Sequence, residues 1–351
     1  MLTVDSHLDL AFNAVEWNRD LTQPIHAIRE SEAGMGQKGR GAGVVSFPEL
    51  RQGRIGLFFA TVHCRIASLG RRFAGVRNQD IAYAKAWGEL AYYRIMESKG
   101  VLRQVRNPDE LESHLEEWDR NPSFAPLGYV LSMEGSDPIV SPEQVPEWWD
   151  QGLRLVSLCH YGVSTYSHGT GAPGGLTPRA PALLRALEEA GMILDVSHLA
   201  EQAFWEALDQ FGGPVGATHN CCQALCPGDR QLNDKQIRTL VSRGGVIGVA
   251  LDVWMLSPSW SGEDQDNSAI SLETVTDHID HICQLAGDAR HAAIGSDLDG
   301  GYGREQCPHD LHTIADLRKI PPLLERRGYS LEDVTSIMGG NWVRLLREAW
   351  S

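Results

Sequence analysis

The length, composition and charge of this chain exclude several classes of protein. It has 351 residues, of which 42% are hydrophobic and 22% charged, a composition typical of a globular protein and not of a disordered or fibrous one. The formal net charge of −15 comes without a long basic run, so we expect neither nucleic acid nor a membrane surface as a partner. The sequence contains no uncharged apolar stretch of about 18 residues, so it does not predict a membrane-spanning helix. The first residues carry no secretory signal pattern, which favours a cytoplasmic location.

Short apolar or β-branched runs alternate with amphipathic helical segments along most of the chain. Helical patterns lie at 80–100, 181–191, 201–212 and 234–245, and several end at a glycine suited to a left-handed helix cap. Such alternation predicts a parallel sheet covered by helices. The predicted strands are residues 2–7, 55–63, 128–134, 154–160, 192–198, 214–219, 246–252 and 292–297. Eight strands of this kind favour a closed (β/α)8 TIM barrel of the α/β class over an open sheet.

Two irregular stretches interrupt this alternation early in the chain. Residues 10–54 form a long insertion after the first predicted strand, and residues 71–80 are a second such stretch. Loops of this kind commonly carry function, so we expect both at the mouth of the barrel. No repeat of fixed period and no low-complexity linker divides the chain. The sequence therefore predicts a single barrel domain over residues 1–351.

Histidines and acids stand at the carboxyl ends of the predicted strands. In a (β/α)8 barrel these ends converge on one face, where active sites lie. Neutral imidazole and carboxylate are donors that suit Zn²⁺ and related divalent ions. A single histidine at a strand end is usually a hydrogen-bonded loop residue, but five or more at equivalent ends are hard to explain in that way. The residues are His7 with Asp9, His63, Glu134, His160, His198, His219, Asp252 and Asp297.

Other candidate residues have simpler explanations. Asp5 alternates in phase with His7 but lies deeper in the strand, which suggests that it orients a ligand. The thiols in HNCCQALC lack a second CxxC-type pair, so reduced cysteines are favoured over a thiolate metal site. Asp299 is expected in a turn or behind the ligands, whereas the roles of His63 and His168 stay open.

Two histidine pairs have helical spacing without a position at a strand end. They are His278 with His281, and His309 with His312. Both pairs stand in polar segments, so we expect them on solvated helix faces and not in a metal site.

A set of short motifs carries a resemblance to a known family. DSHLD, MEG, DVSH, THNCCQALCPGDR, GGVIGV, IGSDLDG and GGNWVRLL occur in this order over nearly the whole chain. The set resembles the membrane (renal) dipeptidase family, the M19 metallopeptidases of the amidohydrolase-like barrels. This resemblance implies a (β/α)8 barrel, a hydrolase acting on small dipeptide-like substrates, and two zinc ions per chain. Family members are often dimers, so it also allows a homodimer.

The resemblance further implies a metal-ligand set. His7 and Asp9 would bind one zinc ion, His198 and His219 the other, and Glu134 would bridge the two together with a water or hydroxide. Many related barrels use a carbamylated lysine as the bridge. None of the five lysines here ends a predicted strand, and Glu134 is the only glutamate in that position.

Three more residues match family positions near the substrate. His160 would contact the substrate near the scissile carbonyl and steady the developing oxyanion. Arg230 would hold the substrate by its terminal carboxylate, for which a planar guanidinium is suited. Asp297 would take a proton from the attacking water and pass it to the leaving amine. For Arg230 the alternative is a surface salt bridge, but its spacing of eleven from His219 favours the functional interpretation.

The sequence departs from better-known relatives near the substrate. GSD follows Glu134 where many relatives have two glycines and a histidine, and the loop after His160 lacks the expected asparagine. Substrate preference, including action on D-residues or β-lactams, therefore stays open. One alternative is another amidohydrolase with the same metal core that acts on N-acyl amino acids or lactams. Another is a catalytically silent barrel used for binding.

Overall fold

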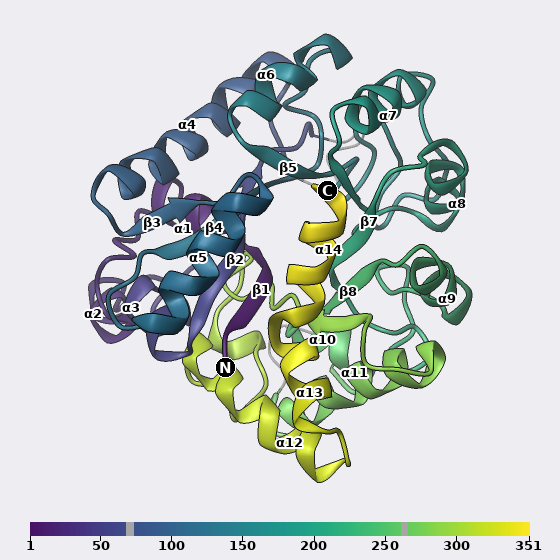
Figure 1. Cartoon of the computed structure of the whole chain (residues 1–351). Coiled ribbons are helices and arrows are strands. Elements are labelled where there is room, and N and C mark those ends of the chain that lie inside the picture. Colours follow the sequence, from purple (N-terminus) through teal and green to yellow (C-terminus); the bar gives the residue numbers. More distant parts are fainter. Residues whose placement is uncertain (68–73, 261–265) are drawn as a thin grey trace.

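Eight parallel strands close into a barrel in the computed structural model, which describes residues 1–67, 74–260 and 266–351 (Figure 1). Each strand pairs with its neighbours in parallel, and pairing of β2 with β4 closes the ring. The predicted (β/α)8 architecture is confirmed. The barrel strands are β1 (Thr3–Leu8), β2 (Ile55–His63), β4 (Leu127–Glu134), β5 (Leu153–Ser157), β6 (Ile193–Asp195), β7 (Val215–Asn220), β8 (Val246–Val249) and β9 (Ala292–Ile294).

A ninth short strand and four early strand ends differ from the sequence prediction. The extra strand, β3 (Leu102–Gln104), pairs with β4 at the outside of the barrel, and its three residues are too few for a period of two to be recognised. β5 ends at Ser157 and β6 at Asp195, so His160 and His198 lie in the loops that follow and not in the strands themselves. β8 and β9 likewise end three residues before Asp252 and Asp297.

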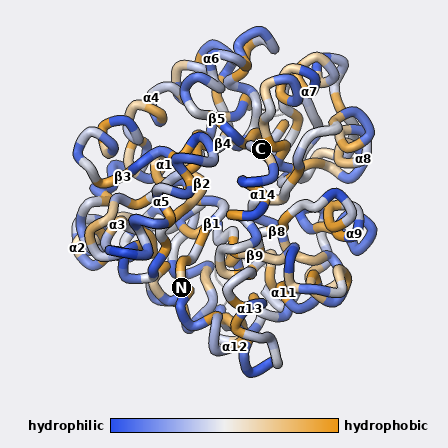
Figure 2. The backbone as a smooth tube through the Cα atoms, viewed as in Figure 1, coloured by the Kyte–Doolittle hydropathy of each residue, from blue (hydrophilic) through white to orange (hydrophobic). Residues whose placement is uncertain are grey.

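Helices surround the barrel and turn their apolar sides toward it (Figures 1 and 2). Helix α9, for example, begins with a capping box between Asn233 and Gln236 and ends before Gly244, which has a φ of 71°. The longer helices are α4 (Gln79–Ser98), α5 (Pro108–Arg120), α7 (Ala180–Glu189), α8 (Glu201–Gln210), α9 (Asp234–Ser242), α11 (Leu272–Ala286) and α14 (Asn341–Ala349). Shorter ones are α6 (Val145–Asp150), α10 (Val253–Leu256), α12 (Ile320–Arg326) and α13 (Leu331–Thr335).

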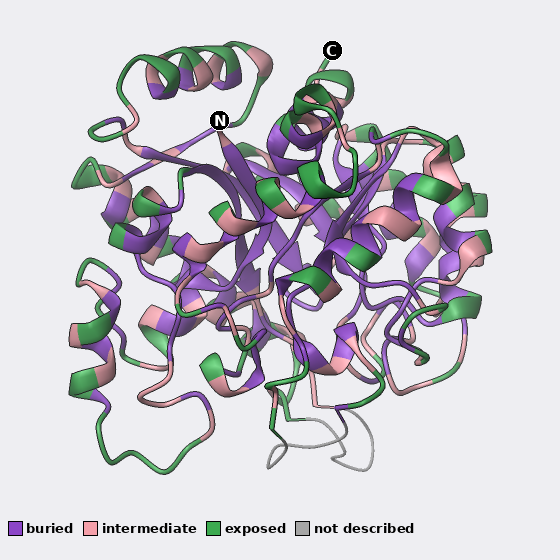
Figure 3. Cartoon of the chain, turned by 90° about the horizontal axis from the view of Figure 1, so that it is seen from below, coloured by how far each residue is buried: buried purple, intermediate pink, exposed green. Residues whose placement is uncertain are grey.

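Helix α14 closes the amino-terminal end of the barrel. Its Trp342 is fully buried, its ring centroid lies 4.9 Å from that of Phe59 in β2, and its indole N–H donates to the carbonyl of Ile294 at 3.3 Å. Trp342 packs with inward-facing strand residues such as Val4 and Leu155. Both chain ends lie on this side of the molecule, whereas the loops that follow the strands lie on the opposite side (Figure 3). The carboxyl end of the barrel is therefore the end available for a site.

The segment between β1 and β2 is folded and packed. It contains α1 (Leu10–Val15), α2 (Ile25–Ser31) and α3 (Phe47–Gln52). A buried ion pair joins Arg19 to Glu32 at 2.8 Å, and the carboxylate of Asp299 accepts from the backbone of Val44 and Val45. The carboxylate thereby ties this segment to the loop after β9. Of the irregular stretch 71–80, residues 71–73 lie outside the described residues.

The two histidine pairs with helical spacing lie only in part where the sequence predicted. His278 on α11 is fully buried: its Nδ1 accepts from the backbone N–H of Cys222 at 3.0 Å, and its Nε2 lies 3.0 Å from the carbonyl of Leu256. The prediction of a solvated face was wrong here because the ring meets a hydrogen-bond partner at each end. His281 is half-buried beside Asp234. His309 and His312 are exposed to solvent as predicted, but they lie in an irregular segment before the next helix and not on a helix face.

The described helices do not combine the length and apolar character that crossing a membrane requires.

Candidate metal centre

Glu134, the last residue of β4, lies at the centre of a group of imidazoles. Its Oε1 atom is 3.1 Å from His219 Nε2 and 3.2 Å from His198 Nε2. The same oxygen is 3.6 Å from His160 Nε2 and 3.7 Å from His7 Nε2. These residues come from four other parts of the barrel, and Glu134 is only 4% exposed. Histidines that are far apart in the sequence therefore lie together around one buried oxygen.

Two more acids extend this group on the side of β1. His7 Nε2 is 3.7 Å from Asp9 Oδ1 and 3.9 Å from Asp297 Oδ1. The Oδ1 atom of Asp9 is buried and has no hydrogen-bond partner among the described residues. Three sets of donor atoms lie close enough together to hold an ion, and each set has its atoms within 4.8 Å of one another: His7, Glu134 and His219; His63, Glu134 and His160; His7, Asp9 and Asp297.

Left-handed backbone aims two of these side chains. His198 has a φ of 66° and Asp297 a φ of 57°, a region that residues other than glycine rarely occupy. Each residue lies in the loop three positions after the end of a short strand, β6 or β9. Conformations of this kind persist where the surrounding structure determines them, and they cluster at functional sites.

Burial sets the ionisation of the group. It lowers the pKa of His7 to about 4, with a further contribution from the neighbouring His219. Burial, followed by the charge of Arg230, lowers the pKa of His219 to about 4 and that of His198 well below its usual value. These imidazoles are therefore neutral near pH 7, which is the form that binds a metal ion.

The acids of the group shift in the opposite direction. Burial raises the pKa of Asp297 well above its usual value, and the charges of Asp9 and Glu134 add to this effect. Burial also raises the pKa of Asp9. Neutral imidazole nitrogens, crowded carboxylates and the unpartnered Asp9 oxygen are together the donor set of a divalent cation site. The residues present thus fit bound metal ions.

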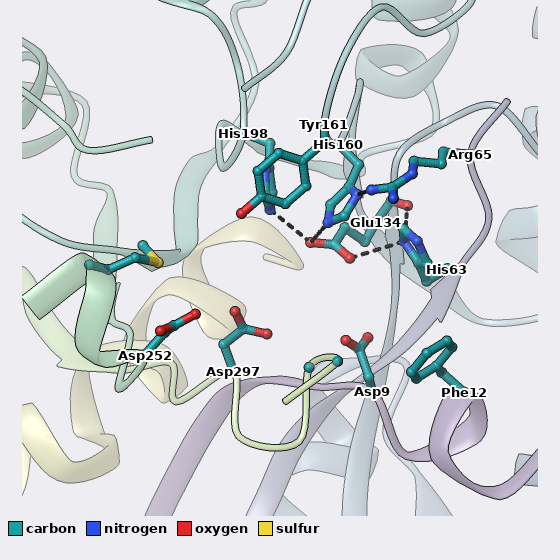
Figure 4. Close-up of a pocket in the computed structure, with 13 residues that line it drawn as sticks. Asp9, Phe12, His63, Arg65, Glu134, His160, Tyr161, His198, Asp252 and Asp297 are labelled. Carbon is teal, nitrogen blue, oxygen red and sulfur yellow. Dashed lines mark hydrogen bonds and ion pairs between the residues drawn. The ribbon is translucent and has the colours of Figure 1, made fainter. Parts of the chain in front are cut away.

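A pocket of about 260 Å³ opens onto these residues (Figure 4). Asp9, Asp252 and Asp297 lie on one side of it, and Arg65 and His160 lie on the other beside Glu134. Three carboxyl groups therefore face a guanidinium and an imidazole across the pocket.

Some residues of the pocket escaped sequence reasoning. His63, whose role stayed open, has its Nδ1 3.0 Å from Glu134 Oε2, the second oxygen of that carboxylate. Arg65 contacts His160 Nδ1, and the ring of Tyr161 packs at 4.7 Å against that of His160. The strand-end position of His63 was a usable signal, whereas nothing in the local sequence marks Arg65 or Tyr161.

Arg230 lies behind the histidines and does not line the pocket. It is 2% exposed, and its Nη2 donates to the carbonyl of His219 at 2.7 Å. Its Nη1 is buried and makes no hydrogen bond within the described part of the chain. The alternative of a surface salt bridge is therefore wrong for Arg230, and one guanidinium donor is left unpaired.

A (β/α)8 barrel with imidazoles and carboxylates gathered at its carboxyl end defines the class of metal-dependent hydrolases. A profile of the membrane dipeptidase family (peptidase family M19) matches residues 1–351. The chain therefore belongs to this family and is a hydrolase of the dipeptidase type.

Individual relatives agree with this assignment. A Klebsiella pneumoniae protein, described as an uncharacterized protein in the pqqA 5′ region, is 33% identical over 275 residues, which cover 75% of this chain and 96% of that protein. Dipeptidase aclJ from Aspergillus oryzae is 28% identical over 318 residues, covering 87% and 69% respectively. A metallopeptidase structure from Rhodobacter sphaeroides, liganded with a phosphinate mimic of the dipeptide L-Ala-D-Ala, has a TM-score of 0.79 and 20% identity, covering 100% and 99%, and this likeness shows the fold.

Proposed function

We propose that this protein is a binuclear zinc dipeptidase that hydrolyses the peptide bond of dipeptides. The observation that carries the proposal is the position of Glu134 Oε1, between 3.1 and 3.7 Å from the Nε2 atoms of four histidines. A carboxylate in such surroundings has the position of a bridging ligand.

The ligand set divides into two halves around Glu134. His7 and Asp9 would hold one ion, His198 and His219 would hold the other, and Glu134 would contribute its carboxylate to both. The orphaned Asp9 oxygen and the 3.1 Å approach of His198 Nε2 to His219 Nε2 support this division. When bound, two zinc ions supply a water of lowered pKa and polarise the scissile carbonyl.

His160 orients and stabilises the substrate carbonyl. Its Nδ1 contacts the guanidinium of Arg65, which can only donate, so Nδ1 accepts and Nε2 carries the ring proton. This Nε2–H points into the pocket, 3.6 Å from Glu134 Oε1 (Figure 4). It is thus placed to donate to the oxygen that gains negative charge during attack on the amide.

Asp297 moves the proton between water and leaving group. It lines the pocket opposite His160, and burial together with the charges of Asp9 and Glu134 raises its pKa. A carboxyl group with a raised pKa can accept a proton from the attacking water and return it to the amine nitrogen of the departing amino acid.

The pocket suits a short peptide. Its volume of about 260 Å³ matches a small molecule. Arg230 does not line this pocket, so its unpaired Nη1 would meet the terminal carboxylate only if the side chain becomes accessible when substrate binds. The Rhodobacter sphaeroides relative carries a mimic of L-Ala-D-Ala. We therefore include dipeptides with a D-residue at the carboxyl end among the substrates of this chain.

The proposal is tested by elemental analysis and a substrate panel on one preparation. We expect about two zinc ions per chain and hydrolysis of L,L- and L,D-dipeptides. His219→Gln should lower metal content and activity together, whereas the matched His281→Gln, half-buried on α11 and outside the pocket lining, should change neither. Preferential hydrolysis of N-acyl amino acids or lactams would contradict the dipeptide assignment. Less than one tightly bound ion per chain, with no rescue by added zinc, would contradict the binuclear centre.

A homodimer and a cytoplasmic location stay predictions from the sequence.

A further inference from the structure

A buried carboxylate and a buried hydroxyl lie directly behind the proposed metal ligands. Asp195 ends β6 and Thr218 lies in β7, and their side chains meet with Asp195 Oδ2 2.6 Å from Thr218 Oγ1. Asp195 is 5% exposed and Thr218 1% exposed, so solvent does not compete for their hydrogen bonds. The directions of these bonds can therefore be worked out from the donors and acceptors present.

Asp195 acts only as an acceptor. Its Oδ1 atom receives the backbone N–H groups of Ser197 and Thr218, each at 3.0 Å, and a backbone N–H can only donate. The short contact at Oδ2 is then an O–H···O bond in which Thr218 donates its single proton. A second hydroxyl, that of Ser197, lies 3.3 Å from Thr218 Oγ1, but it donates to Asn220 Oδ1 at 2.9 Å.

The hydroxyl oxygen of Thr218 is thus left with lone pairs only. His219 Nδ1 lies 2.9 Å from this oxygen, so Nδ1 must carry the proton and donate it. A neutral imidazole protonated at Nδ1 has a lone pair at Nε2. In His219 that lone pair faces Glu134 Oε1 and His198 Nε2, both at 3.1 Å. The lone pairs of His219 Nε2 and Glu134 Oε1 repel each other unless a cation lies between them.

The same oxygen also reaches the other half of the centre. His7 Nδ1 lies 3.5 Å from Thr218 Oγ1, at the outer limit of a hydrogen bond, and its ring centroid is 3.7 Å from that of His219. One hydroxyl therefore approaches the Nδ1 atoms of two histidines that the proposed function assigns to different metal ions.

We propose that Asp195 and Thr218 are positioning residues that fix the tautomer of His219, and more weakly that of His7, so that each presents an Nε2 lone pair to a metal ion. This inference rests on the proposed binuclear centre. It adds that the protein selects the metal-binding tautomer before any ion arrives. The chain of contacts runs from the carboxylate through the hydroxyl to the imidazoles, and no water is needed in it.

The direct test is the tautomer of His219 in the metal-free protein. Long-range ¹H–¹⁵N spectra of ¹⁵N-histidine-labelled protein distinguish protonated from unprotonated ring nitrogens, and loss of a signal in His219→Gln assigns the residue. We expect Nδ1–H in the wild-type protein. An Nε2–H form, or a mixture of both forms, would overturn the proposal without reference to activity.

Variants test the consequence for metal binding. Thr218→Val keeps the shape and removes the acceptor, and we expect zinc affinity, measured by chelator competition, to fall about 10- to 100-fold. Thr218→Ser should restore most of the affinity, and Asp195→Asn should weaken it by a similar factor. Thr276→Val is a matched control, because Thr276 is also fully buried but lies on α11 and bonds to a backbone carbonyl. Unchanged zinc affinity in folded Thr218→Val would overturn the proposal.

The two proposals fail in different ways. If the wild-type protein binds no zinc yet shows the Nδ1–H tautomer at His219, the binuclear centre fails and the positioning by Thr218 stands. If two zinc ions bind but the tautomer of His219 is mixed, the binuclear centre stands and the positioning by Thr218 fails.

Discussion

His198 Nε2 and His219 Nε2 lie 3.1 Å apart, and both face the same oxygen of Glu134. These two nitrogens and the carboxylate oxygen cannot all find a hydrogen-bond partner within the group. Bound cations should therefore stabilise the folded protein. We predict that chelator treatment abolishes hydrolysis and lowers the thermal unfolding midpoint. Zinc at 100 times its Kd should add about 2.7 kcal/mol to the free energy of unfolding.

Differential scanning fluorimetry with and without zinc checks this prediction. Glu134→Gln serves as the control, since it should lose the zinc-dependent shift while the rest of the barrel is unchanged. An equal zinc-dependent shift in this variant would place the stabilising ion elsewhere.

Replacing Asp297 by asparagine should separate metal binding from proton transfer. Asparagine keeps the size of the side chain but cannot carry the proton, so we expect kcat to fall at least about 10²-fold. Zinc content, measured by elemental analysis, should stay at the wild-type value. Full activity in Asp297→Asn would remove this residue from proton transfer, and loss of zinc would make it a ligand instead.

The family resemblance assigns Arg230 to the substrate carboxylate, a contact that requires its buried, unpaired Nη1 to become accessible because Arg230 does not line the pocket. A hydrogen bond between charged groups contributes about 1.5–3 kcal/mol, equivalent to roughly 10- to 100-fold in binding. We therefore expect Arg230→Gln to raise KM for L-Ala-D-Ala by such a factor and to leave KM for the corresponding dipeptide amide nearly unchanged. Because Arg230 also bonds to the carbonyl of His219, zinc content is measured alongside. Equal effects on the acid and the amide would contradict a role in carboxylate binding.

The free energy of unfolding should decrease as the pH rises from weakly acidic to weakly basic values, because of Glu89. This α4 residue is 1% exposed, and burial raises its pKa to about 8 from an ordinary 4.5. The folded state therefore holds a proton that the unfolded state releases above about pH 4.5, and folding is penalised increasingly up to pH 8, at about 1.4 kcal/mol per unit. Its Oε2 accepts the backbone N–H of His63, a bond that the amide oxygen of glutamine can keep.

We expect Glu89→Gln to flatten this decline by a few kcal/mol in urea unfolding at pH 5 and pH 8. Glu116→Gln, on the exposed face of α5, is the control and should follow the wild type. If Glu89→Gln and the wild type lose stability in parallel, the buried carboxyl group is not the cause.

Much of the fold could be predicted because the barrel strands are short apolar or β-branched runs that alternate with amphipathic helical segments. The candidate ligands could be predicted because a parallel barrel brings all its strand ends to one face, so position relative to a strand end is enough to group His7, Glu134 and His219. Spacing along the chain could not reveal Arg65 or Asp195, because their importance depends on which side chains the barrel closure places beside them.

Local conformation was the other limit. The sequence extended β5 and β6 through His160 and His198, whereas both strands end earlier and the left-handed φ of His198 sets its direction. His278 was assigned to the surface because it stands in a polar segment. The sequence could not show that both ring nitrogens would find backbone partners in the interior.

Because α14 closes the amino-terminal end of the barrel, the barrel interior is completed only when this helix has been synthesised. Trp342 caps an interior whose other members, such as Val4 and Phe59, are synthesised far earlier. Until the ribosome has released this late segment, the early strands have an apolar lumen open to water at one end. Completion of the lumen therefore depends on contacts between distant parts of the sequence, the kind that form slowly and leave unfinished chains prone to association. We expect nascent chains of this protein to need shielding until the tryptophan is in place.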